Sequence, residues 1–154
     1  MFKKIICLCL TFALLFGFCS CKSNKYFKTT GQKLKVEEIS SEVFSKIKLE
    51  CTVNGRAIDH NLNQEQIKDL YNSLKLKKVK ILTPKSGFEE YISSLKYIGL
   101  CFSTGYNLNE QYGYFAIYEN DLAYESLSQV IDGSHYFNAE KGTYENIYNL
   151  LKKK

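Results

Sequence analysis

The side chains best suited to catalysis or metal binding are few and scattered along this 154-residue chain. The two histidines, His60 and His135, lie far apart, and neither belongs to a group of cysteines or acids with the spacing of zinc ligands. The chain contains no Gly-x-Ser-x-Gly elbow, glycine-rich phosphate loop or catalytic-cysteine signature. Adjacent Glu89 and Glu90 would point about 100° apart in a helix, so they do not form an acid–base pair. We therefore predict no catalytic residues, no metal and no cofactor.

The chemistry that remains belongs to tyrosine, of which the chain has 12. Alternation along residues 96–104 and 112–119 places several tyrosines on one face of two strands, with aliphatic and phenylalanine side chains on the other. Tyrosine combines a flat apolar ring with a polar tip, which suits the recognition of sugars and peptides. The candidate binding residues are Tyr97, Tyr112, Tyr114 and Tyr118. The alternative is that these tyrosines simply form a solvated sheet face, because tyrosine has a high β propensity.

Only two of the six cysteines, Cys51 and Cys101, lie beyond the first 21 residues. The same alternation puts Cys51 on the core side and Cys101 on the tyrosine side. A disulfide needs its two Cβ atoms within roughly 3.5–4.5 Å, which opposite faces of one sheet do not allow. We therefore predict that this pair is not bridged.

The elements that would position these residues follow from periodicity and turn signals. Alternation predicts strands at 47–53, 77–82, 96–104, 112–119 and 122–126, and Asn54-Gly55 predicts a hairpin after the first. Asn63 and Gln66 form a capping-box signature at the start of a helix over 64–76, and helical spacing predicts a short helix near 88–95 and a last helix capped by Thr143. This is an α+β pattern, a single mainly antiparallel sheet with two helices packed on one face. The predicted core face consists of Ile47, Leu49, Val53, Val79, Ile81, Ile98, Leu100, Phe102, Phe115 and Ile117.

The N-terminal segment indicates where the protein resides. Lys3 and Lys4 precede an uncharged, apolar run from Ile5 to Phe18, which is the layout of a secretory signal. The run is shorter than the roughly 20 residues that a membrane-spanning helix needs. Ser20-Cys21 resembles the lipobox of bacterial lipoprotein precursors, although Phe18 and Cys19 depart from the usual pattern. The resemblance implies cleavage before Cys21, acylation of that cysteine and attachment to the outer face of the cell membrane. Ordinary cleavage with release and an uncleaved anchor are the alternatives.

The resulting organisation is a signal peptide at 1–20, a lipid anchor and flexible tether at 21–45, and a single α+β domain at 46–154. Without Lys3 and Lys4, the chain keeps 19 basic side chains against 16 acidic ones. This excess is small and spread along the chain, and Arg56 is the single arginine. Nucleic acid is not an expected partner, because base and phosphate recognition favour arginine.

The expected function is that of a non-catalytic, lipid-anchored binding module of the cell envelope. Its partners would be the membrane, through the lipid, and an envelope polymer, a peptide or a protein. The order of elements resembles that of small uncharacterised lipoproteins of Gram-positive bacteria, a likeness of pattern that implies no activity. One alternative is an immunity-type lipoprotein that sequesters a peptide toxin or inhibits an enzyme. Another is a hydrolase, which would require His60 or His135 beside an acid in a cleft.

Overall fold

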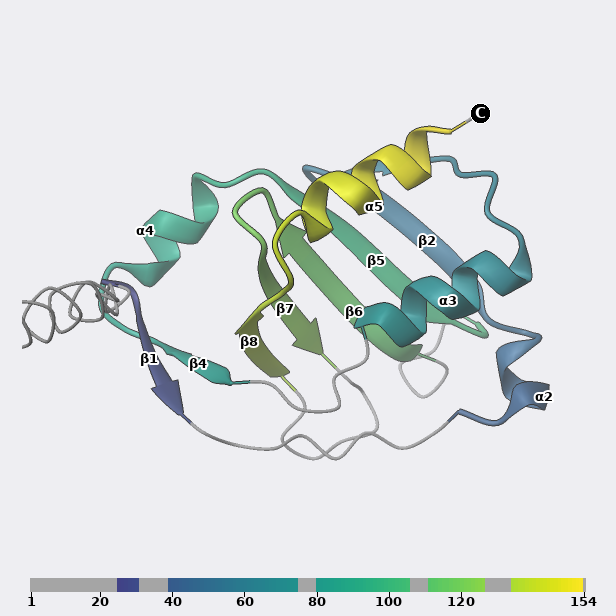
Figure 1. Cartoon of the computed structure of the whole chain (residues 1–154), viewed down its shortest axis with the longest axis horizontal. Helices are drawn as coiled ribbons and strands as arrows, with labels where there is room; N and C mark the ends of the chain where they lie inside the picture. Colours follow the sequence, from purple (N-terminus) through teal and green to yellow (C-terminus); the bar gives the residue numbers. More distant parts are fainter. Residues whose placement is uncertain (1–24, 31–38, 75–79, 106–110, 127–133, 154) are drawn as a thin grey trace, which may run out of the picture.

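The computed structural model describes residues 25–30, 39–74, 80–105, 111–126 and 134–153. Within them, eight strands form one antiparallel sheet in the order β1-β4-β8-β7-β6-β5-β2-β3, and four helices accompany it (Figure 1). The predicted single, mainly antiparallel sheet is confirmed, and the mostly β content supports the α+β class in part. The elements in chain order are β1 (Phe27–Thr30), α2 (Ser41–Phe44), β2 (Lys48–Val53), β3 (Arg56–Ile58), α3 (Gln64–Leu74), β4 (Ile81–Pro84), α4 (Phe88–Ser93), β5 (Tyr97–Ser103), β6 (Gln111–Tyr118), β7 (Leu122–Ser126), β8 (Ser134–Asn138) and α5 (Thr143–Lys152).

The predicted hairpin after β2 is confirmed. Asn54 and Gly55 both have positive φ, 50° and 76°, as the tightest hairpin turns require. Val53 pairs with Arg56 across this turn, and β2 pairs on its other side with β5. The short strand β3 therefore forms one edge of the sheet.

The predicted capping box at the start of α3 is also confirmed. The Asn63 amide donates to Gln66 Oε1 at 2.9 Å, and the Gln66 amide donates to Asn63 Oδ1 at 2.9 Å. These reciprocal bonds satisfy two backbone donors that a helix start leaves free. The buried residues of the helix fall at the predicted positions, Ile67, Leu70, Tyr71 and Leu74.

A larger core lies between one sheet face and the helices α3 and α5, which Figure 1 shows lying over β2, β5 and β6. Several of its residues, among them Ile98, Phe102, Phe115 and Ile117, have no measurable solvent exposure. This face carries the predicted core residues; Val79 lies outside the described residues. The larger core also includes Phe44, Leu49, Cys51, Leu100, Ala123, Phe137, Tyr144, Ile147 and Leu151.

The expected gathering of the helices on one face is not confirmed, because α4 belongs to a second core. Phe88 of α4 packs edge-on against Phe27 at 4.9 Å and Tyr136 at 4.7 Å between ring centroids. Leu82 and Leu122 complete this cluster. Strand register places these strand residues on the face opposite the larger core. The sheet continues beyond α3 and α5 as far as β1. The helix α4 buries the apolar side chains of these outer strands.

The folded part of the chain begins earlier than the predicted boundary at residue 46. Phe27–Thr30 pair with β4 as an edge strand, and Phe44 is 5% exposed in the larger core. Sequence alternation is weak in both short segments, so neither stood out from the polar residues around it. No helix in the described part of the chain has the length and apolar character needed to cross a membrane.

The start of α5 differs from its prediction. Thr143 does not cap the helix; its hydroxyl donates to Glu140 O at 2.7 Å, and the N-cap position is Gly142. The cap comes from a distant turn, where the Asp121 carboxylate accepts the Gly142 and Tyr144 amides at 2.7 and 2.9 Å. Asp121 therefore fastens α5 to the β6–β7 turn.

Candidate functional site

Five tyrosines from four adjacent strands form one surface, here called the tyrosine face: Tyr97, Tyr114, Tyr118, Tyr124 and Tyr136. Strand pairing places Tyr97 opposite Tyr118, and Tyr124 opposite Tyr136. The ring centroids of these pairs are 5.8 and 4.9 Å apart, and those of Tyr114 and Tyr124 are 6.4 Å apart. All five side chains are half-buried. Three of the four predicted binding residues are thus brought together, with two further tyrosines beside them.

Gly99 is what allows Tyr114 to lie flat on the sheet. A Cβ atom at Gly99 would stand 2.5 Å from Thr52 Oγ1 and 3.0 Å from the Tyr114 hydroxyl. Real Cβ contacts are not that short, so a side chain at position 99 would displace both neighbours. Because position 99 has no side chain, the Tyr114 ring can lie close to the backbone at the centre of the tyrosine face.

Three phenols of this surface are held in their protonated form. Burial raises the pKa of Tyr114, Tyr118 and Tyr136 above the ordinary tyrosine value. Neighbouring tyrosines add to the rise for Tyr114 and Tyr118, and Glu89 followed by Tyr124 adds to it for Tyr136. A protonated phenol both donates and accepts a hydrogen bond. Tyr114, Tyr118 and Tyr136 therefore offer apolar rings with neutral hydroxyl groups that can both donate and accept hydrogen bonds.

The fourth predicted residue, Tyr112, does not belong to the tyrosine face. The β5–β6 register shifts between Phe102 and Ser103, so that Gln111 and Gly113 are paired while Tyr112 is the extra residue of a β-bulge. Its side chain packs against the larger core, and its carbonyl accepts the Tyr71 hydroxyl at 3.4 Å. Strict alternation misplaces it because a one-residue bulge reverses the face of every residue before it.

The two cysteines lie on the faces that alternation predicted. Cys51 is buried in the larger core, Cys101 is half-buried beside Tyr114 on the other face, and both are free. Burial raises the pKa of Cys51 to about 12. Burial and then the charge of Glu50 raise the pKa of Cys101. Because the thiolate is the reactive form, neither cysteine is placed as a nucleophile.

His60 is hydrogen-bonded to the backbone through both of its ring nitrogens. His60 Nε2 donates to Leu49 O at 2.9 Å, while its Nδ1 accepts the Leu62 amide at 3.2 Å. Both ring nitrogens are thus occupied, and the ring joins the loop before α3 to β2. His135 lies opposite Glu125 in the β7–β8 pairing. Among the described residues, no three histidine, cysteine or acidic side chains are grouped closely enough to hold a metal ion.

Glu125 is a buried acid that the sequence analysis did not single out. Its side chain has no solvent exposure, and neither carboxyl oxygen has a hydrogen-bond partner. Burial raises the pKa of this carboxyl to about 7. After burial, its charge is the second cause that raises the pKa of Tyr71. The period-two pattern could have found it, because Ala123 and Glu125 alternate onto the core face with Phe115.

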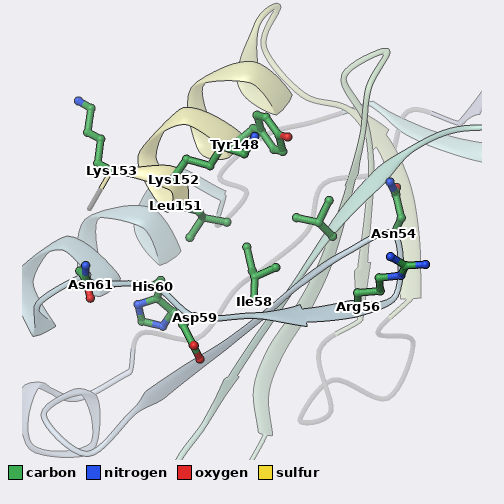
Figure 2. A pocket seen from close by; sticks show the side chains of 11 residues that line it. Asn54, Arg56, Ile58, Asp59, His60, Asn61, Tyr148, Leu151, Lys152 and Lys153 are labelled. Carbon is green, nitrogen blue, oxygen red and sulfur yellow. The ribbon is translucent and has the colours of Figure 1, made fainter.

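A cleft of about 770 Å³ separates the β2–β3 hairpin from the C-terminal half of α5 (Figure 2). Its apolar walls are Val53 and Ile58 on one side and Leu151 on the other. Its polar residues are Asn54, Arg56, Asp59, His60, Asn61, Tyr148, Lys152 and Lys153. Periodicity could not reveal it, since it lies between segments nearly 90 residues apart.

In comparison with known proteins, no family model, curated protein or solved structure matches this chain.

Proposed function

We propose that this protein is a non-catalytic, lipid-anchored binding module of the cell envelope that uses the tyrosine face to hold an envelope glycan. The observation that carries the proposal is the gathering of five half-buried tyrosines on one sheet face. Flat rings stack on the faces of sugar rings, and protonated phenols exchange hydrogen bonds with sugar hydroxyls.

The arrangement of the helices leaves this surface accessible. Of the described helices, α2, α3 and α5 bury their apolar residues in the larger core on the opposite face. The helix α4 covers one end of the tyrosine face, where the cluster of Phe88 and Leu122 packs against Tyr118 and Tyr136. A glycan fits better than an extended peptide, because peptides that add to a sheet bind at an edge strand and this surface lies on central strands.

The N-terminal signal supports the anchor. With Cys21 acylated, only residues 22–25 would separate it from Tyr26, whose carbonyl already accepts the Lys85 amide at 2.8 Å. Five residues span at most about 18 Å. The β1 edge would then lie next to the membrane, where Lys25, Lys28, Lys80 and Lys85 are exposed. Each lysine near an anionic lipid surface contributes about 1 kcal/mol.

The anchor is tested by replacing Cys21 with alanine in the full chain and growing cells with a fatty-acid analogue. We expect the natural protein to carry the label and to fractionate with membranes, and the C21A protein to lose both properties. A natural protein that remains unlabelled would refute the anchor, whatever the tyrosine face binds.

The binding face is tested by co-sedimentation of the full chain with purified, insoluble cell-wall polymer. The triple variant Tyr97→Phe/Tyr114→Phe/Tyr124→Phe keeps the rings and removes three hydroxyls, so we expect binding weaker by about tenfold or more. Tyr112→Phe is the matched control on the other face and should sediment like the natural chain. Equal binding by the triple variant, or no binding by the natural chain, would contradict the proposal. Protection of cells against a peptide toxin without polymer binding would instead favour an immunity lipoprotein.

A further inference from the structure

The cleft between the hairpin and α5 exists because the edge of the sheet is not fully covered. The helix α5 contacts β5 and β6, and register places Val53, Arg56 and Ile58 on the same face as Ile98 and Leu100. These edge residues extend beyond the helix. Val53 and Ile58 therefore remain half-exposed, whereas the residues they pair with on the inner strands are fully buried.

The charged side chains around this apolar floor are mainly cationic: Arg56, Lys152 and Lys153 against Asp59. Arg56 stands at the hairpin end, and the Lys152 ammonium lies 4.1 Å from the centre of the Tyr148 ring. In Figure 2, Ile58 and Leu151 point toward each other, while Lys153 extends outward from the helix. No salt bridge within the described residues involves Arg56 or Lys152. This partly apolar cavity thus carries two cations, Arg56 and Lys152, that form no ion pair with the described residues.

We propose that this cleft binds a small amphiphilic anion, a molecule with a carboxylate or phosphate group on an apolar body. The apolar body would lie on Val53, Ile58 and Leu151. The anionic group would meet the Arg56 guanidinium, whose planar fork matches carboxylate and phosphate oxygens, with Lys152 as the second cation. The volume lies within the range of small-molecule sites, roughly 300–1,000 Å³.

Other occupants fit less well. The Asp59 carboxylate is the single acid of the lining, so a cation would face three positive side chains and one negative one. Catalysis is not implied, because both nitrogens of His60 are bonded to backbone groups. The cleft lies on the face opposite the tyrosine face, so this inference does not depend on the glycan proposal.

The test uses the full chain in lipid nanodiscs with labelled isoleucine, leucine and valine methyl groups, titrated with octanoate and octyl phosphate. Octyltrimethylammonium, with the same chain and opposite charge, is the control probe, and empty nanodiscs account for partitioning into lipid. We expect both anions to shift the Val53, Ile58 and Leu151 signals saturably, and the cation to bind at least about tenfold more weakly. A preference between the two anions would show which headgroup the cleft favours.

Matched variants locate the anion. Arg56→Gln and Lys152→Gln should each weaken octanoate binding by about fivefold to tenfold, the loss of one charge-assisted contact. Lys68→Gln removes the same charge from an exposed position on α3 and should leave binding unchanged. The proposal is overturned if the cation binds as well as the anions, if all three variants bind alike, or if the shifts map to methyl groups outside the cleft. Polymer sedimentation by the Arg56 variant should remain normal.

Discussion

At the scale of single residues, Glu125 is the side chain least compatible with its surroundings. A buried carboxyl without partners is destabilising mainly when it is ionised. Its pKa of about 7 stands above the 4.5 expected of an exposed glutamate. The folded state therefore binds this proton more tightly than the unfolded state. The stabilisation that protonated Glu125 adds to the unfolding free energy is complete below pH 4.5. It is lost as the pH rises to about 7.

Glu125→Gln should remove this pH dependence. Glutamine has the shape of the protonated acid and cannot ionise, so the variant and the natural protein should have similar unfolding free energies near pH 4.5. At pH 8 the variant should be more stable by on the order of 3 kcal/mol, which corresponds to the size of the pKa shift. Denaturant unfolding from pH 4.5 to 9 measures the difference.

The control for this experiment is Glu50→Gln, which changes an exposed acid of the same sheet. Its unfolding free energy should follow that of the natural protein across the whole pH range. If the Glu125 and Glu50 variants show the same pH dependence, the buried carboxyl is not the group that titrates.

At the scale of elements, α5 depends on the carboxylate of a distant turn. Asp121 has φ 61°, a left-handed conformation that aspartate tolerates better than most residues. This conformation belongs to the turn that delivers both carboxylate oxygens to the α5 amides. The cap therefore links the C-terminal helix, one wall of the cleft, to the strands that carry the tyrosine face.

Asp121→Gly should loosen α5 without straining the turn, because glycine accepts a positive φ. The loss of both capping bonds should lower the unfolding free energy by about 1–2 kcal/mol. Asp121→Asn keeps one acceptor oxygen, so its unfolding free energy should fall by less. Amide hydrogen exchange at Gly142 and Tyr144 should speed up in the same order. Unchanged exchange in the glycine variant would mean that the cap does not hold the helix start.

At the scale of the whole molecule, the sheet has two unlike edges. One edge is β1, which follows the proposed anchor directly, and the other is β3, which borders the cleft. Strands in a sheet are roughly 4.8 Å apart, so eight strands separate the two edges by about 34 Å. Anchoring through Cys21 would hold the cleft on the side of the domain away from the membrane.

This orientation can be measured with labels on the two edges. Single cysteines at Lys28 of β1 and at Ala57 of β3, both exposed, would each carry a nitroxide in a Cys51→Ala/Cys101→Ser chain. With the acylated protein in vesicles that contain a nickel-chelating lipid, relaxation should be markedly stronger at position 28. Equal relaxation at both positions would show that the domain does not rest on its β1 edge.

The amino-acid sequence by itself determined the local features. The Asn54-Gly55 turn, the capping box of Asn63 and Gln66, the buried positions of α3 and the opposite faces of Cys51 and Cys101 follow from interactions within a few residues. Such features repeat with the period of one strand or one helix, so they can be read from the chain. The proposed secretory signal and lipobox at Ser20-Cys21 rest on local patterns of the same kind.

The tertiary structure alone decided how distant segments meet. It moved Tyr112 off the tyrosine face through a bulge, added Tyr136 to that face, and placed the α5 cap on Asp121. It also recruited Phe27 into an edge strand and brought Arg56 and Lys152 to one cleft. Each outcome depends on the register between strands or on contacts between remote segments, and neither leaves a repeating signal in the sequence.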